Sequence, residues 1–236
     1  MNTNLTEIAF ILDRSGSMQS CLEAAIAGFN QFLREQQSAP GQARFTLVLF
    51  DDQYEVPCLS IPITEVTALD TTTFVPRGST ALLDAIGRTI DELGAKLDAE
   101  PETNRPGQVL VAILTDGLEN ASHRYSLQDV SSRIARQRDT YQWRFLFLGA
   151  GQDAIATAVS MNIAAHDSSA FIADNLGFRT SGSSMSRKTM ALRKSQAKAP
   201  MTAKEQADLH ASMSEITAEE DKKARDEGKP GDQHGA

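Results

Sequence analysis

The chain has 236 residues, of which 41% are hydrophobic and 23% are charged, and its formal net charge is −8. This composition is typical of a globular protein, and the acidic balance argues against nucleic-acid binding by overall charge. No apolar run approaches the length of a transmembrane helix, and the polar start does not resemble a signal peptide, so we expect a cytoplasmic protein without membrane contact. Cys21 and Cys58 lack metal-ligand spacing and are expected to be reduced.

The first half of the chain alternates between strand and helix patterns. The continuous apolar run at 7–12 predicts a buried strand, and helical spacing of apolar residues over 22–33 predicts the first helix. Strands are expected at 44–50 and 54–59, and the short turn between them predicts an antiparallel pair at an edge of the sheet. After an irregular stretch, a helix is expected at 82–97.

The alternation continues in the second half. The run at 109–114 is the strongest strand pattern, and a helix at 126–138 begins at Ser126, which is a suitable cap. A further strand is expected at 143–148. The remaining expected elements are a helix at 153–160, a short strand at 162–165 and a last helix at 168–176.

These elements predict an α/β fold. It is a doubly wound, Rossmann-like and mostly parallel sheet with one antiparallel edge strand, followed by a flexible C-terminal tail. In such sheets, ligands bind outside the carboxyl ends of the strands. Asp13 follows the first strand directly, and Asp116 follows the strand at 109–114. Both carboxylates are therefore expected at the same edge of the sheet.

The periodic pattern stops after residue 176, where we place the end of the folded domain. We interpret 177–201 as a basic, Ser/Gly-rich linker, because it carries six Lys or Arg and no acidic residue. Residues 202–236 are expected to be a polar tail. Capping-box patterns at 202–205 and 217–220 predict short helices there, and 228–236 is expected to be disordered.

Oxygen-bearing side chains gather at the predicted carboxyl edge. Asp13, Ser15 and Ser17 alternate directly after the first strand, Thr80 precedes the helix at 82–97, and Asp116 follows a buried strand. Serines after a strand commonly form only turns or caps. Three such loops at one edge favour a metal site instead, and oxygen donors suit a hard cation such as Mg²⁺.

These three motifs, Asp-x-Ser-x-Ser, Gly-Ser-Thr-Ala and Thr-Asp-Gly, closely resemble the metal-ion-dependent adhesion site of von Willebrand factor A domains. The resemblance covers roughly residues 5–176 and favours the prokaryotic or phage intracellular type. It implies that Ser15, Ser17 and Thr80 ligate Mg²⁺ directly, with Mn²⁺ and Ca²⁺ as alternatives, and that Asp13 and Asp116 act directly or through water.

The resemblance also implies a function. In the family, the open coordination position takes an Asp or Glu carboxylate from a partner protein, and some intracellular members work beside AAA+ ATPases. Arg14, Glu119 and Asn120 flank the ligands in sequence and are expected at the rim that faces such a partner. Ordinary solvated side chains are the alternative for all three.

We expect a binding protein and not an enzyme. Ser15 stands where an aspartyl-phosphate enzyme would carry a second carboxylate, and the chain has neither a Gly-x-Ser-x-Gly elbow nor a P-loop. Three alternatives stay open. The site could belong to a metal-dependent phosphoesterase, the basic stretch at 179–198 could bind nucleic acid, or tail acids could fill the metal position in cis. The acids considered are Glu215, Glu219 and Glu220.

Overall fold

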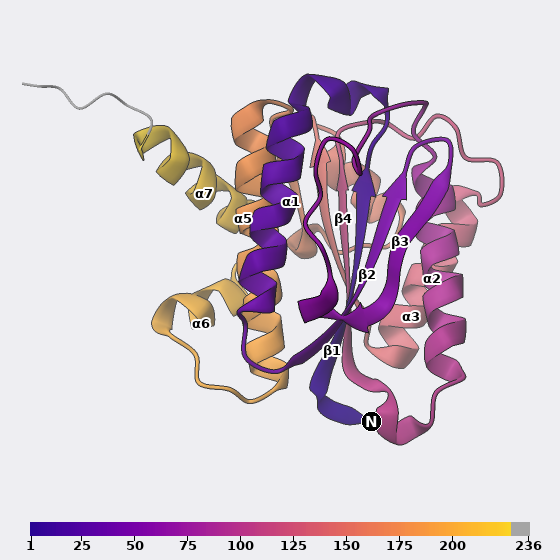
Figure 1. The fold of residues 1–236 in the computed structure, drawn as a ribbon, viewed down its shortest axis with the longest axis vertical. Coiled ribbons are helices and arrows are strands. Elements are labelled where there is room, and N and C mark those ends of the chain that lie inside the picture. The colour runs from indigo at the N-terminus through magenta and orange to yellow at the C-terminus, as the bar shows by residue number, and fades with distance from the viewer. Residues whose placement is uncertain (228–236) are drawn as a thin grey trace, which may run out of the picture.

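The computed structural model describes residues 1–227, and these fold around one central sheet (Figure 1). Within that part of the chain the strands are β1 Asn2–Asp13, β2 Gln42–Phe50, β3 Tyr54–Pro62, β4 Pro106–Thr115, β5 Arg144–Ala150 and β6 Ser168–Phe171. Their order across the sheet is β3-β2-β1-β4-β5-β6. All neighbouring pairs are parallel except β2 and β3, which confirms the predicted sheet and its antiparallel edge strand.

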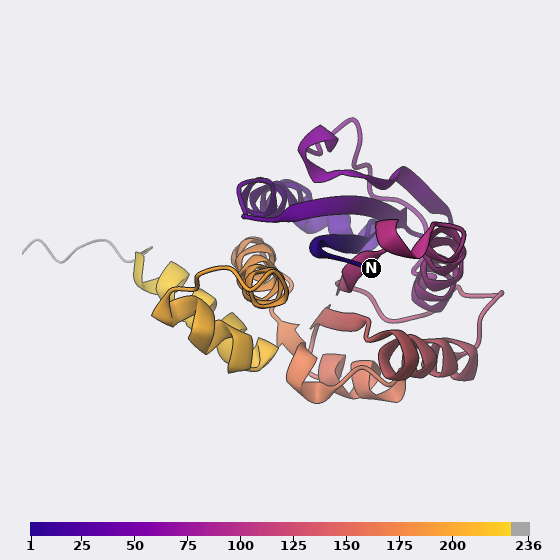
Figure 2. The ribbon, with the colours of Figure 1, turned by 90° about the horizontal axis from the view of Figure 1, so that it is seen from below.

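Helices cover both faces of the sheet (Figure 2). The α-helices of residues 1–227 are α1 Leu22–Gln37, α2 Leu82–Asp98, α3 Leu127–Tyr141, α4 Ala154–Ser160, α5 Asn175–Gln196, α6 Ala203–His210 and α7 Met213–Glu227. Helices α1 and α5 lie on one face, and α2, α3 and α4 lie on the other. Short 3-10 helices are η1 Gly16–Cys21, η2 Ile63–Glu65, η3 Glu102–Asn104 and η4 Ala165–Asp167. No helix of the described residues is long and apolar enough to cross a bilayer.

The central strand β1 is buried on both faces because its side chains alternate between the two helical layers. Phe10 and Leu12 face the α1 side, whereas Ala9 and Ile11 face the α2 side. Phe10 meets Phe29 of α1 edge-on, with 5.4 Å between the ring centroids. The continuous apolar run at the start of the chain is therefore the signature of a strand enclosed from two sides.

Helix α5 replaces most of the predicted linker, so the interpretation of 177–201 as a flexible segment was wrong. Its small residues allow a close approach to α1. A Cβ placed on Gly182 would lie 2.4 Å from the carbonyl oxygen of Gly28, and a Cβ on Gly28 would lie 2.4 Å from the carbonyl oxygen of Phe178. The Ser/Gly-rich composition therefore reflects tight helix packing and not flexibility.

The end of the sheet also differs from expectation. The structure places the last strand at Ser168–Phe171, not at 162–165, and the helix predicted at 168–176 begins only at Asn175. Asn162 has a φ of 66°, which is incompatible with an extended strand at that point. The true strand is short and half polar, so its sequence pattern is weak.

Helices α6 and α7 both pack against α5. The capping box at 202–205 is confirmed as the start of α6. The second pattern was placed too late, because α7 begins four residues before Thr217, where Ser212 and Glu215 cap each other. The predicted disordered end at 228–236 lies outside the described residues.

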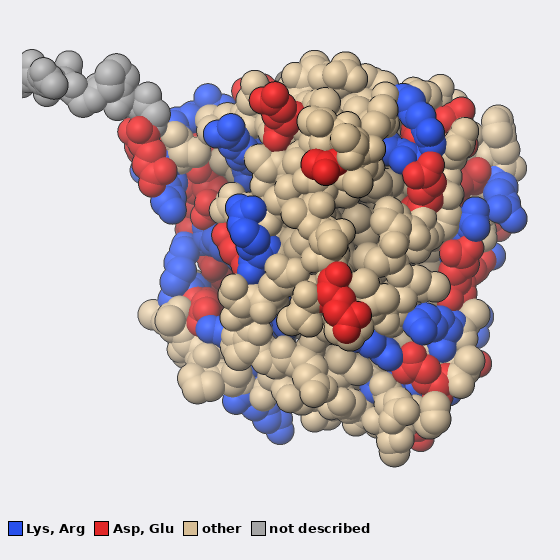
Figure 3. All heavy atoms as spheres, viewed as in Figure 1, with Lys and Arg blue, Asp and Glu red and all other residues tan. Residues whose placement is uncertain are grey.

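Two basic side chains of α5 hold α6 and α7 in place. Lys188 is fully buried, and its Nζ donates to the carbonyl oxygens of Asp208, Leu209 and Ala211 at 3.2, 3.0 and 2.6 Å. Arg187 pairs with Asp208 at 2.5 Å and also with the last two acids of the cis hypothesis, Glu219 and Glu220. Acidic and basic side chains intermingle over this side of the molecule (Figure 3). Because Arg187 of α5 engages both Glu219 and Glu220, the structure does not favour the hypothesis that these two acids fill the metal position in cis.

Candidate metal site at the carboxyl edge of the sheet

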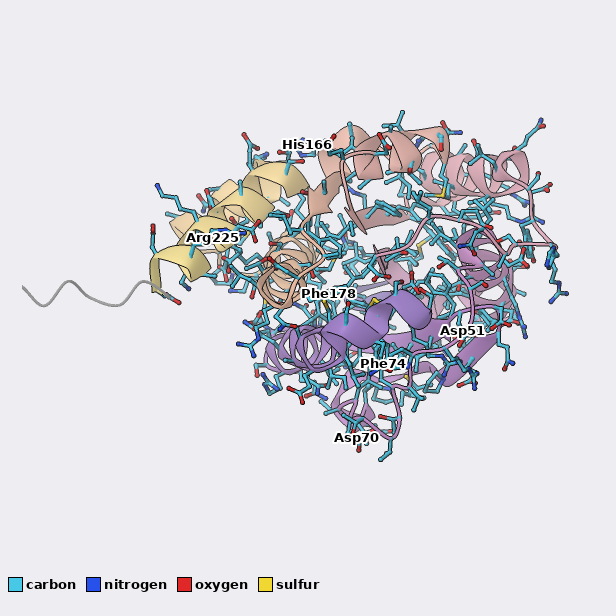
Figure 4. The ribbon with its side chains drawn as sticks, turned by 90° about the horizontal axis from the view of Figure 1, so that it is seen from above. Asp51, Asp70, Phe74, His166, Phe178 and Arg225 are labelled. Atoms are coloured by element: carbon cyan, nitrogen blue, oxygen red, sulfur yellow. The ribbon has the colours of Figure 1, made fainter. Side chains whose placement is uncertain are left out.

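Three loops meet at the carboxyl ends of the central strands, the edge viewed from above in Figure 4. Strand β1 ends at Asp13 and continues into η1, which carries Ser17. The neighbouring parallel strand β4 ends at Thr115, directly before Asp116. The third loop carries Thr80 just before α2. The parallel pairing of β1 and β4 places the first two loops side by side, as the sequence predicts.

Short contacts join the predicted ligands of the first two loops. Ser17 Oγ donates to Asp116 Oδ1 at 2.8 Å, and the hydroxyl oxygens of Ser15 and Ser17 are 3.1 Å apart. The amide N–H of Ser15 donates to Asp13 Oδ1 at 2.7 Å, and Thr115 Oγ1 donates to Asp13 Oδ2 at 2.5 Å. Oxygen atoms that lie 99 residues apart in sequence therefore face one another.

Thr80 reaches the same place from the third loop. A Cβ on Gly117 would lie 2.6 Å from Thr80 Oγ1, so that hydroxyl rests against the backbone next to Asp116. A larger residue at 117 would force the Thr80 side chain to shift. The structure thus brings all five predicted ligands to one edge, and their binding of a metal ion stays a prediction.

The two carboxylates are held in conditions that disfavour their charge. Burial raises the pKa of Asp116 to about 6; the hydrogen bond from Ser17 opposes this rise, and the charge of Asp13 adds to it. Burial also raises the pKa of Asp13, although the hydrogen bond from Thr115 opposes the change. A bound cation would offset both the desolvation and the repulsion between the carboxylates.

The donor set fits a hard divalent ion. It consists of two carboxylates and three hydroxyls, and it contains no imidazole or thiolate. Throughout residues 1–227, no group of three or more His, Cys, Asp or Glu is placed to hold a metal. Oxygen ligands of this kind suit Mg²⁺ or Mn²⁺ better than a soft metal. When bound, the ion would supply a positive charge beside these oxygen atoms.

Arg14 does not lie where the sequence suggests. Its side chain is only 4% exposed and turns toward the β2–β3 hairpin, where Nε contacts Asp51 at 2.9 Å and Nη1 contacts Glu55 at 2.7 Å. The prediction that Arg14 rims the site and faces a partner was therefore wrong. An arginine between two ligands in sequence carries no signal for the direction that its side chain takes.

Glu119 and Asn120 tie two of the loops together. Asn120 Oδ1 accepts from Thr80 N at 2.9 Å, and the backbone N–H of Asn120 donates to Thr80 O at 3.0 Å. Glu119 accepts from the N–H of Leu83 at 2.9 Å and so caps α2. Asn120 is exposed beside Thr80, and its place at a partner-facing rim stays a prediction, whereas the carboxylate of Glu119 is engaged by backbone N–H groups.

Two supporting residues escaped the sequence analysis. Asp51 is fully buried and accepts from both Arg14 and Arg77. Asp84, in the first turn of α2, accepts hydrogen bonds from three backbone N–H groups of residues 123–125. An Asp-Asp pair directly after a buried strand is the only signal for Asp51, and it is a weak one.

Comparisons with known proteins identify the fold. No protein-family model and no curated protein matches the chain. Proximal thread matrix protein 1 from the mussel byssus is 16% identical over 79% of this chain and 46% of its own, with a TM-score of 0.55. Manganese-loaded TRAP from Plasmodium vivax is 18% identical over 84% of this chain and 75% of its own, with a TM-score of 0.54.

A von Willebrand factor type A protein from Catenulispora acidiphila is also similar, at 18% identity over 79% of this chain and 42% of its own, with a TM-score of 0.50. The chain spans less than half the length of this protein and of the mussel protein. At such low identities the likeness establishes the architecture only. The chain therefore has the fold of a von Willebrand factor A domain.

Proposed function

We propose that this chain is a protein-binding module that holds Mg²⁺ and uses the ion to capture an Asp or Glu carboxylate of a partner protein. The observation that carries the proposal is the contact of Ser17 Oγ with Asp116 Oδ1, beside Ser15, Asp13 and Thr80. Three neutral hydroxyls leave much of the charge on the ion, so its open position attracts an anionic ligand.

Metal-loaded structures of the same fold support a divalent ion. The mussel protein has been observed with a zinc-occupied MIDAS motif, and the Plasmodium protein with manganese. We propose Mg²⁺ for this chain because of its all-oxygen donor set. Mn²⁺ accepts the same ligands and is a useful probe of the site.

A titration of Mg²⁺ into the purified protein tests the metal site, with Ser17→Ala as the variant and Ser20→Ala as its matched control. Both serines are exposed and lie in η1, but Ser20 Oγ donates to the carbonyl oxygen of Ser17 instead of facing Asp116. We expect Ser17→Ala to weaken Mg²⁺ binding at least about tenfold and Ser20→Ala to leave it unchanged. Equal affinities in all three proteins would refute the metal assignment.

A peptide-display selection tests the partner chemistry without a known partner. Peptides are bound in Mg²⁺ and eluted with EDTA. We expect the selected sequences to share an Asp or Glu whose change to Asn or Gln abolishes binding. Peptides that bind equally well in EDTA, or that tolerate loss of the acid, would contradict carboxylate capture.

The phosphoesterase alternative requires a nucleophile or base beside the ion. Asp13 accepts hydrogen bonds from Ser15 and Thr115 and is completely buried, which favours a supporting role over attack on a substrate. A screen of nitrophenyl phosphates and nucleotides, with and without Mg²⁺, is expected to show no turnover. Hydrolysis that depends on Ser17 would overturn the proposal of a binding module.

The structure gives little support to the nucleic-acid alternative. Most of the basic side chains of 179–198 are engaged within the fold and are not free to meet phosphates. The engaged residues are Arg187, Lys188, Arg193 and Lys194. A salt-dependent gel shift with single- and double-stranded DNA and RNA tests this alternative, and we expect none.

A further inference from the structure

Two arginines and two carboxylates form a closed ion cluster beside the candidate metal site. Nε of Arg14 and Nε of Arg77 both lie 2.9 Å from Asp51 Oδ2. The same two guanidinium groups contact the two oxygens of Glu55, at 2.7 and 2.6 Å. Asp51 is fully buried and Arg14 nearly so, whereas Arg77 is 44% exposed. We call these four residues the Asp51 cluster; Figure 4 labels Asp51.

The arginines of the cluster sit in the two loops that bear the hydroxyls. Arg14 lies between Asp13 and Ser15, and Arg77 lies three residues before Thr80. Backbone hydrogen bonds cross between the same loops: Arg77 N donates to Arg14 O at 3.0 Å. A second one runs from residue 16 to the carbonyl oxygen of residue 78, at 3.2 Å. Backbone hydrogen bonds thus join the two loops directly, and the two arginine side chains bind the same pair of carboxylates.

The β2–β3 hairpin is the fixed support for both loops. The carbonyl oxygen of Asp51 accepts from Ala81 N at 2.9 Å, directly after Thr80, and the carbonyl oxygen of Phe50 accepts from Arg14 N at 2.8 Å. Asp51 Oδ1 also accepts from Gln53 N, which holds its carboxylate in the tight turn. Each hydroxyl-bearing loop is therefore attached to the end of β2 from its own side.

We propose that the Asp51 cluster positions the hydroxyls of Ser15, Ser17 and Thr80 for the metal ion. This inference rests on the proposed function. Two arginines and two carboxylates carry no net charge together, so the cluster adds little long-range field at the ion. Its contribution is geometric, because a guanidinium fork that bridges two carboxylates fixes the backbone from which it extends.

A change at Arg77 separates position from charge, because the two effects have opposite signs. Arg77→Gln removes a positive charge near a cation site, so electrostatics alone would strengthen Mg²⁺ binding. The loss of the bridge to Asp51 and Glu55 loosens the loop of Thr80 and is expected to weaken Mg²⁺ binding about tenfold, as the loss of a supporting residue around metal ligands commonly does. The direction in which the Mg²⁺ affinity changes therefore decides between the electrostatic and the positioning effect.

Arg44→Gln is the matched control. Arg44 pairs with Glu7 and Glu100, both at 2.9 Å, and it lies near the start of β2, at the opposite end of the sheet. The Arg44→Gln substitution removes a comparable bridge between one arginine and two carboxylates. Thermal unfolding in EDTA confirms that both variants fold and reports the stability lost by each. A purely structural role for Arg77 predicts lower stability with unchanged affinity, as expected for Arg44→Gln.

Mg²⁺ titration of the full chain, the Arg77→Gln variant and the control completes the test. We expect weaker binding only in Arg77→Gln, together with faster amide exchange at residues 16 and 77 in EDTA. Unchanged or tighter binding in Arg77→Gln would refute the positioning role while leaving the metal site intact. Failure of the unaltered protein to bind Mg²⁺ would refute the proposed function, and this inference with it.

Discussion

The close contact between α1 and α5 predicts that Gly182→Ala lowers the free energy of unfolding, whereas Gly→Ala at an open position of another helix raises it. A Cβ on Gly182 would lie 2.4, 2.7 and 2.8 Å from the backbone O, C and Cα of Gly28. Ordinary contact begins at 3.4 Å, so α5 must move by about 1 Å to accept a methyl group. No side-chain rotation relieves the clash, because all three atoms belong to the backbone of α1.

The magnitude follows from two opposing terms. Alanine gains about 1 kcal/mol over glycine inside a helix, and overpacking a well-filled contact costs up to about 3 kcal/mol. Gly182→Ala is therefore expected to lower the free energy of unfolding by about 2 kcal/mol. Gly94 of α2 is the control, since a Cβ there meets only the Gln137 side chain at 3.5 Å. Gly94→Ala is expected to raise the free energy of unfolding by about 1 kcal/mol.

Urea unfolding followed by circular dichroism measures the change in the free energy of unfolding of both variants. The two changes are expected to differ in sign as well as in size. The reciprocal variant Gly28→Ala, whose Cβ would lie 2.4 Å from Phe178 O, is expected to behave like Gly182→Ala. A stabilised Gly182→Ala protein would show that α5 does not approach α1 as closely as the structure has it, and the account of the Ser/Gly-rich segment would then be wrong.

Two further predictions concern charged groups. Lys188→Met removes the ammonium from three carbonyl oxygens at the end of α6 and is expected to cost about 3 kcal/mol of stability, because hydrogen bonds to charged groups are strong. Proteolysis within 197–212 should accelerate, and unchanged cleavage would contradict this role of Lys188. The hydrogen bond from Arg14 and its charge hold the pKa of Glu55 at about 2, below its ordinary 4.5, so its contribution to stability is present above about pH 4.5 and is lost as the pH falls through about 2. The difference in melting temperature between the unaltered protein and Glu55→Gln should therefore shrink over that range; a difference independent of pH would count against the ion pairs.

The parts of the fold that could be predicted are those whose local sequence pattern is unambiguous. Strands β1 and β4 are enclosed by helices on both faces, so their sequences are continuous apolar runs, and each ends where polar loop residues begin. Parallel neighbours share an edge, so Asp13 and Asp116 could be placed together without a structure. The position of the Ser15 and Ser17 hydroxyls at this edge could be predicted from their alternate spacing directly after β1.

The remaining features depend on distances that sequence does not display. Helix α5 packs through small residues, and only Phe178, Met185 and Leu192 mark its core-facing side with large apolar side chains, so its sequence pattern is weak. The side chain of Arg14 turns away from the rim because Asp51, 37 residues later, lies within hydrogen-bond reach. Such pairing depends on the close approach of a hairpin and a loop, and neither segment alone contains a signal for it.

The two borders of the sheet bear on how the protein avoids self-association. Strand β3 contains Pro57, which lacks an N–H donor, its pairing with β2 shifts register twice, and Ser60 has a φ of 52°. At the other border β6 has only four residues, and Ser214 Oγ of α7 donates to the carbonyl oxygen of Ser168. Neither border of the described sheet offers a long, flat row of backbone groups to another chain. The fold is thereby protected against growth into edge-to-edge aggregates, and a variant that straightens β3 would put that protection at risk.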